Sequence, residues 1–206
     1  MLRILLVRHG ETDHNVAGLI DGHGHGKLTR KGVAQTKALA QRLRREKIDA
    51  IYTSDLERSH QTALALAKFH PHLKIVVTRL VRERMFGAFE GQNFMAFVKR
   101  YPTYMKNSKR IQNVKTSGQL RKRAKRFLEF LVRTYDKNVA KTTTVLVVGH
   151  GVFNNALIAA LTNTGVNRPW FQQDNTCVNL LERDNVFGCW VIRYLNDTRH
   201  LTGRLR

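Results

Sequence analysis

The chain has 206 residues, 42% of them hydrophobic, enough for one compact domain that buries about 70% of the surface its unfolded form exposes. Its 36 Lys and Arg residues against 15 Asp and Glu give a formal net charge of +21, which predicts attraction to anions but does not specify a fold. Two cysteines exclude a disulfide framework, and no apolar run approaches the ~20 residues of a membrane-spanning helix. No secretory signal follows Met1, so we expect a cytoplasmic protein without a membrane partner.

Short apolar segments rich in Ile, Val and Leu alternate with helical patterns along the chain. The predicted strands are 2–7, 49–53, 74–78 and 143–149. Strands that alternate with helices indicate a mainly parallel sheet. We therefore predict an α/β fold, a three-layer α/β/α sandwich with helices on both faces of the sheet, in a single domain over residues 1–206.

Each long predicted helix has a visible start. Thr29 can cap a helix over 30–47, and Ser54 or Asp55 can cap one over 56–69. A third helix over 119–135 places its apolar residues on one side and its arginines and lysines on the other.

The C-terminal part predicts an antiparallel hairpin over 177–195, with a turn at Asp184-Asn185. Cys177 and Cys189 are expected on its strands as free thiols, and a cross-strand disulfide is the less favoured alternative. Before the third helix the regular pattern lapses. Residues 92–118 are predicted to form a basic, lid-like insertion.

Eleven basic residues and no acidic one lie between positions 99 and 126. They are Lys99, Arg100, Lys106, Lys109, Arg110, Lys115, Arg121, Lys122, Arg123, Lys125 and Arg126. They can form a solvated helix face with a loop, or a surface for non-specific contact with a polyanion. The second reading leaves open a different class of function, a nucleic-acid-binding protein on a phosphatase-like fold. Against it, the segment has no recognised nucleic-acid motif and few aromatic residues.

Polar residues follow all four predicted strands. The first strand leads to Arg8 and His9, the second to Arg58, the third to Glu83 and the fourth to His150. Ligands of an open α/β sheet bind outside the carboxyl ends of its strands, so these side chains are expected to meet at one edge.

Such a set of side chains suits a phosphoryl group. The transition state of phosphoryl transfer carries charge on three equatorial oxygens, which guanidinium groups such as those of Arg8 and Arg58 bind with paired hydrogen bonds. Enzymes accelerate phosphomonoester hydrolysis by up to about 10²¹-fold, so several groups must act together. A neutral imidazole can attack phosphorus, and a carboxylic acid can protonate the leaving oxygen. Glycine after each histidine, Gly10 and Gly151, would let the backbone approach the ligand.

Four segments together resemble the histidine phosphatase superfamily, the phosphoglycerate mutase-like proteins. The segments are "LLVRHGETDHN", "YTSDLERSHQTA", "LVRERMFGAFEG" and "VLVVGHGVFNNALI", in the order typical of that family. The resemblance implies a three-layer α/β/α fold, a phosphohistidine intermediate, and no metal or other cofactor. It implies that His9 is the nucleophile, that Arg8, Arg58 and His150 complete the phosphate pocket, and that Glu83 is the proton donor. Substrate-binding residues would be Asn15, Asp21, Gly22 and Gly151.

Two segments depart from the family pattern. "GLIDG", with Leu19 and Asp21, stands where many members have "GRIQG", and "TSGQ" at 116–119 replaces "GGES". Both changes concern the identity of the substrate. We expect a small phosphorylated, acidic substrate, and an oligomer is compatible with the sequence.

The alternative activity within the family is phosphoglycerate mutase. Mutases resemble one another in an "ERHYG" pattern and a longer chain, whereas this chain has "ERMFG", which favours hydrolysis.

Other readings concern single residues. Arg58 could pair with Asp55 or Glu57 on its own helix, and the "RER" around Glu83 could be only a charged turn. His23 and His25 in "DGHGHG" could bind a metal with Asp21, but a rim loop near the substrate entrance is the favoured interpretation.

Overall fold

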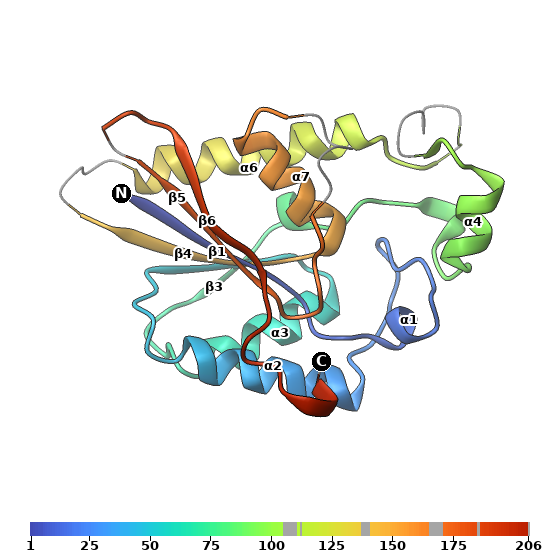
Figure 1. Cartoon of the computed structure of the whole chain (residues 1–206), viewed down its shortest axis with the longest axis horizontal. Coiled ribbons are helices and arrows are strands. Elements are labelled where there is room, and N and C mark those ends of the chain that lie inside the picture. The colour runs from blue at the N-terminus through green and yellow to red at the C-terminus, as the bar shows by residue number, and fades with distance from the viewer. Residues whose placement is uncertain (105–110, 112, 137–140, 165–170, 185, 206) are drawn as a thin grey trace.

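A computed structural model shows a six-stranded sheet between two layers of helices (Figure 1). The structure describes residues 1–104, 111, 113–136, 141–164, 171–184 and 186–205. The strands follow the order β3-β2-β4-β1-β5-β6. Their bounds are β1 Leu2–Arg8, β2 Ala50–Thr53, β3 Ile75–Val77, β4 Thr143–Gly149, β5 Val178–Arg183 and β6 Trp190–Asp197. The first four strands are mutually parallel, and β5 is antiparallel to both of its neighbours. The predicted fold class is confirmed.

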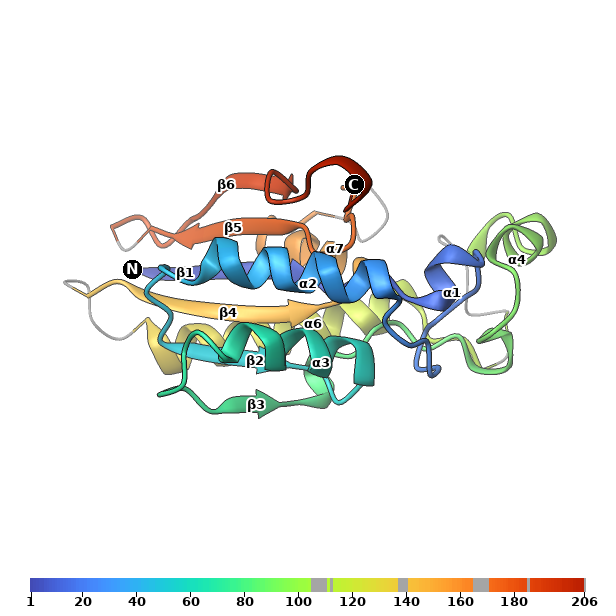
Figure 2. The ribbon, with the colours of Figure 1, turned by 90° about the horizontal axis from the view of Figure 1, so that it is seen from below.

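Alternate side chains of the central strands supply the two cores. Leu2, Ile4 and Leu6 of β1 pack with α6 (Ser117–Tyr135) and α7 (Gly151–Leu161) on one face. Leu5 and Val7 pack with α2 (Arg30–Leu43) and α3 (Glu57–Ala67) on the other. This period of two is the direct consequence of strand geometry. The helices therefore cover both faces of the sheet (Figure 2).

Two of the long helices begin with a side-chain cap. Thr29 accepts a hydrogen bond from Gly32 N and caps α2, as predicted. Thr116 forms a capping box with Gln119 at the start of α6, so the "TSGQ" segment has a structural role.

The predicted cap of α3 by Ser54 or Asp55 is wrong. The N-cap is Leu56, which makes no side-chain cap bond. Ser54 Oγ lies 2.8 Å from His150 Nε2 instead, and Asp55 forms an ion pair with Arg82. Both polar side chains are thus used by tertiary contacts that local sequence does not reveal.

The C-terminal hairpin is formed by β5 and β6, and Asn185 of its predicted turn lies outside the described residues. Cys177 and Cys189 are free, as expected, but each lies one residue before a strand rather than on it. They stand at opposite ends of the hairpin, about 20 Å apart at ~3.3 Å per residue, which rules out the alternative disulfide.

The chain beyond the carboxyl ends of the parallel strands carries α1 (Asp13–Val16) and α4 (Phe94–Arg100), which lie at one end of the molecule in both views (Figures 1 and 2). A third apolar cluster holds this end together. Its buried members are Ile20, Phe86, Phe97, Ile111 and Val114. Residues of the predicted 92–118 insertion therefore pack against the loop after α1. In the part of the chain that the structure describes, no helix is long and apolar enough to cross a membrane.

Candidate active site

His9 directly follows β1 and is 2% exposed. Its Nδ1 lies 2.8 Å from Gly10 O. A carbonyl oxygen only accepts, so Nδ1 carries the proton and Nε2 keeps its lone pair. Arg58 Nε donates to that Nε2 at 3.3 Å. Nε2 is therefore the ring nitrogen that can attack an electrophile, once its lone pair gives up the hydrogen bond from Arg58.

The surroundings of His9 favour the neutral imidazole. Burial lowers the pKa of His9 well below its usual value, and the positive charges of Arg58 and Arg8 lower it further. A neutral ring is the form in which histidine can act as a nucleophile.

Arg58 is the second residue of α3, and its guanidinium turns inward, away from its own helix. Its Nη2 donates to Gly22 O at 2.8 Å and its Nη1 to Gly24 O at 3.1 Å, while Nε also lies 3.6 Å from the Asp21 carboxylate. The alternative pairing with Asp55 or Glu57 is thus wrong. Arg58 instead joins His9 to the loop after α1.

Arg8 is the last residue of β1, and its guanidinium keeps donors available. Its Nη1 donates to Gln173 O at 2.6 Å, and its buried Nε has no hydrogen-bond partner among the described residues. Burial lowers the pKa of Arg8, which nearby acidic groups only partly offset. A buried cation with an unused N–H gains from an incoming oxyanion.

His150 follows β4 and is the N-cap residue of α7. Its ring is fully buried, with its centroid 5.2 Å from that of His9. Nε2 lies 2.8 Å from Ser54 Oγ, whereas Nδ1 has no partner in the described part of the chain. Burial, and then the charge of Arg58, lowers the pKa of His150 well below its usual value. His150 stands beside His9 but does not itself line the cavity described below.

Glu83 follows β3 and a 3-10 turn (Arg79–Val81), and its carboxylate lies at the start of α7. Oε1 accepts from Arg84 N at 2.7 Å and from Phe153 N at 2.9 Å, and Oε2 accepts from Val152 N at 2.9 Å. A carboxylate at a helix N-terminus satisfies donors that have no intrahelical partner. The "RER" segment is therefore not a mere charged turn.

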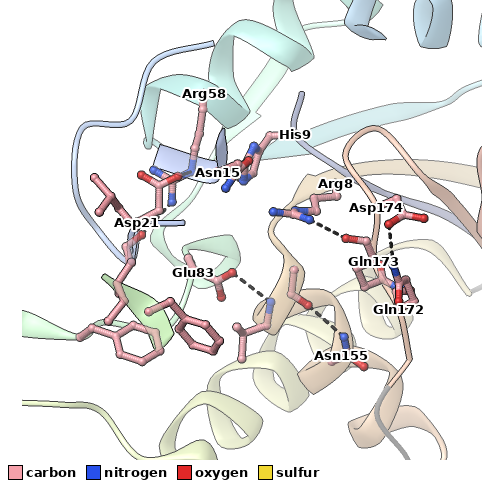
Figure 3. A pocket seen from close by; sticks show the side chains of 17 residues that line it. Arg8, His9, Asn15, Asp21, Arg58, Glu83, Asn155, Gln172, Gln173 and Asp174 are labelled. Carbon is pink, nitrogen blue, oxygen red and sulfur yellow. Dashed lines mark hydrogen bonds and ion pairs between the residues drawn. The ribbon is translucent and has the colours of Figure 1, made fainter. Parts of the chain in front are cut away.

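The side chains of Arg8, His9, Arg58 and Glu83 point into one cavity of about 370 Å³ (Figure 3). The four predicted substrate-binding residues also line it: Asn15, Asp21, Gly22 and Gly151. The structure thus gathers every predicted site residue at this cavity except His150, whose ring lies beside that of His9. Apolar residues also form part of the wall, namely Leu19, Ile20, Phe86, Phe94 and Val152.

The segment 172–174 also lines the cavity, and the sequence did not point to it. Arg8 donates to Gln173 O, and Asp174 is held by Asn196, whose Nδ2 donates to Oδ2 at 2.8 Å. The available signal was the antiparallel direction of β5. Val178 pairs with Val7, so the residues that precede β5 lie beside the end of β1.

The two glycines after the histidines serve different purposes. A Cβ on Gly10 would lie 2.6 Å from Gly32 O and 2.7 Å from Thr36 Oγ1, so Gly10 is required by the close approach of α2 and not by a ligand. A Cβ on Gly151 would meet nothing closer than Arg8 Nε, at 3.6 Å. Gly151 is the first residue of α7, where an N–H has no intrahelical acceptor.

The "DGHGHG" loop is part of the rim of the cavity, which Asp21 and Gly22 line. His23 Nε2 lies 2.9 Å from Glu83 O, Asp21 contacts His14, and His25 is exposed. Asp21, His23 and His25 therefore do not meet at one point, as a shared metal ion would require. Within the described ranges, no group of three or more His, Cys, Asp and Glu residues could hold a metal ion.

Residues 4–198 match the family model of the histidine phosphatase superfamily (branch 1). The chain belongs to that superfamily. It is 30% identical to phosphoserine phosphatase 1 of Hydrogenobacter thermophilus over 98% of this chain and 95% of that protein. It is 28% identical to a metal-independent phosphoserine phosphatase of Arabidopsis thaliana over 97% and 83% of the two chains. A crystal structure of a phosphoserine phosphatase mutant from Entamoeba histolytica in complex with phosphoserine superposes with a TM-score of 0.83 at 25% identity. The match covers 98% of this chain and 100% of that one.

Membership confirms the predicted family and the predicted class of activity, phosphoric monoester hydrolysis. The roles of individual residues are a separate question, which depends on the geometry of this cavity.

Proposed function

We propose that this histidine phosphatase hydrolyses a small phosphomonoester in two steps, with His9 as the nucleophile and without a metal ion. The observation that carries the proposal is the state of the His9 ring. Its Nδ1–H is fixed by Gly10 O, and Nε2 faces a cavity between two buried guanidinium groups.

In the first step His9 Nε2 attacks phosphorus, the N–P bond forms, and the bond to the leaving oxygen breaks. Arg8 and Arg58 bind the equatorial oxygens, on which negative charge is spread in the transition state. The Gly151 N–H is a further donor next to this position, and His150 Nδ1 is another in the tautomer whose Nε2 accepts from Ser54 Oγ. Because these donors are fixed before the substrate arrives, little reorganisation is needed during the reaction.

Glu83 handles the proton. Its Oε2 accepts one hydrogen bond from a described residue and its Oε1 accepts two, so Oε2 is the oxygen with room for a proton. Glu83 protonates the leaving alkoxide in the first step. In the second step it takes a proton from water, which attacks phosphorus as the N–P bond breaks and inorganic phosphate leaves.

The organic part of the substrate is proposed to lie between the apolar wall and Asp174. Outside the phosphate-binding corner, the described residues that line the cavity provide no Lys or Arg for a second acidic group. Asp174 offers a carboxylate instead. This arrangement supports a substrate with a neutral or cationic group, such as the ammonium of phosphoserine, more than the purely acidic substrate expected from the net charge.

A panel of phosphomonoesters assayed with excess chelator tests the proposal. Phosphate release should persist in chelator, with phosphoserine hydrolysed faster than 3-phosphoglycerate, and 2- and 3-phosphoglycerate should not interconvert. His9→Asn should abolish release and remain folded. Interconversion that outpaces phosphate release would instead make the chain a mutase.

A further inference from the structure

A second cavity, of about 310 Å³, lies on the other side of the Glu83 main chain. It shares no lining residue with the catalytic cavity. His23 Nε2 and Arg123 Nη2 both contact Glu83 O, at 2.9 and 2.8 Å, so the backbone of residue 83 is the wall between the two cavities.

Cationic side chains dominate its lining. They are Arg79, Arg82, Arg84, Lys115 and Arg123, with His23 at the edge. No Asp or Glu is among the described lining residues. Two carboxylates lie close by. Asp55 pairs with Arg82 at 2.5 Å and with Arg79 at 3.7 Å, and the charge of Glu83, across the wall, acts on Arg84 and Arg123. The five formal positive charges of the lining thus outnumber these two negative ones.

The recessed cations in this cavity are bound largely to neutral groups. Arg123 Nη1 donates to the carbonyls of Arg79, Leu80 and Arg82, and Arg84 Nε donates to Lys115 O. Carbonyl dipoles satisfy hydrogen bonds without neutralising charge. Burial accordingly lowers the pKa of Arg123 to about 10.

Two exposed cations stand at the mouth. The Arg79 side chain is 82% exposed, and Lys115 is exposed. They can close over a ligand that the recessed arginines attract. Because the charge is gathered in a cavity and not spread along a ridge, it suits a compact anion better than the backbone of a nucleic acid, which needs an extended basic groove.

We propose that this cavity is a second anion-binding site, specific for a small oxyanion with two or more negative charges, of the size of pyrophosphate. It gives the basic segment 99–126 a defined task, since Lys115 and Arg123 belong to it. Lys106, Lys109 and Arg110 of that segment lie outside the described residues and are not part of the proposed site.

Titration calorimetry at about 150 mM salt, with the non-hydrolysable analogue methylenediphosphonate, tests the site. The wild-type chain should bind two equivalents. The double variant Arg79→Gln/Lys115→Gln should bind one equivalent, or should bind the second equivalent at least tenfold more weakly than the wild-type chain does. The control is Lys37→Gln/Lys68→Gln, which removes two exposed charges, one in α2 and one directly after α3, on the opposite face of the sheet. It should bind two equivalents.

Kinetics and folding separate this site from the catalytic one. Hydrolysis of nitrophenyl phosphate should be unchanged in both double variants, and circular dichroism should show both folded. The proposal would be overturned if the wild-type chain bound only one equivalent of methylenediphosphonate. It would also be overturned if both double variants lost the same affinity for the second equivalent. Binding of a short oligothymidylate is measured with the same variants. If Arg79→Gln/Lys115→Gln weakens binding of the oligothymidylate but not of methylenediphosphonate, the anion-site proposal is overturned in favour of a nucleic-acid surface.

Discussion

Glu83→Gln removes the proton that Glu83 donates and keeps two of its three hydrogen bonds. The amide can keep one oxygen facing Arg84 N and Phe153 N, but its NH₂ then faces Val152 N–H, which loses its acceptor. One hydrogen bond to a charged group is lost, so the free energy of unfolding should fall by about 1.5 to 3 kcal/mol. The amide has no proton to give, so chemistry that needs an acid should slow much more.

The assay compares leaving groups. With an alkyl ester such as phosphoserine, kcat/KM should fall by roughly 10²- to 10⁴-fold, the usual contribution of a general acid. With nitrophenyl phosphate, whose leaving group is stable as an anion, the fall should be below about tenfold.

Glu90→Gln is the matched control. Oε1 of Glu90 accepts two backbone N–H groups, from His23 and Phe86, but Glu90 does not line the catalytic cavity. The amide oxygen of Gln can keep both bonds, so this variant should lose less stability than Glu83→Gln and should show no dependence on the leaving group. Equal losses on both esters in Glu83→Gln would remove Glu83 from the role of acid.

Two further predictions concern pH and backbone packing. Burial and then the charge of Arg58 lower the pKa of His9, so the acid limb of the pH profile of kcat/KM should lie below pH ~6.5. Arg58→Gln removes the positive charge and should move this limb to higher pH. A limb that does not move would contradict the role given to Arg58. The folded state resists protonation of His9, so the free energy of unfolding should decrease as pH falls below ~6.5 in denaturant titrations. Gly10→Ala should cost about 1 to 3 kcal/mol because its Cβ meets Gly32 O, whereas Gly151→Ala, with ordinary contacts, should melt near the wild-type temperature.

The fold was predictable because strand and helix patterns are local. The apolar runs of β1 and β4 and the cap at Thr29 are read from a few consecutive residues, and all three form. The capping box at Thr116 was not predicted. The cap of α3 was not predictable, because Ser54 forms a hydrogen bond with His150, which follows β4 and is distant in sequence. Local propensity is overridden where such a tertiary contact exists.

The site was predictable to the extent that it lies at carboxyl ends of parallel strands. Arg8, His9 and Glu83 follow this rule. Gln173 and Asp174 do not, since they precede an antiparallel strand whose direction no short motif specifies. The reason for Gly10 was likewise hidden, because it depends on the packing of α2.

The position of phosphate on the protein tests the central claim most directly. The chain is quenched under alkaline conditions during turnover, and the phosphorylated residue is identified by mass spectrometry and by nitrogen-phosphorus coupling in the NMR spectrum. We predict phosphate on Nε2 of His9, because the proton on Nδ1 is held by Gly10 O. Phosphate on Nδ1, on His150, or on no histidine at all would contradict it.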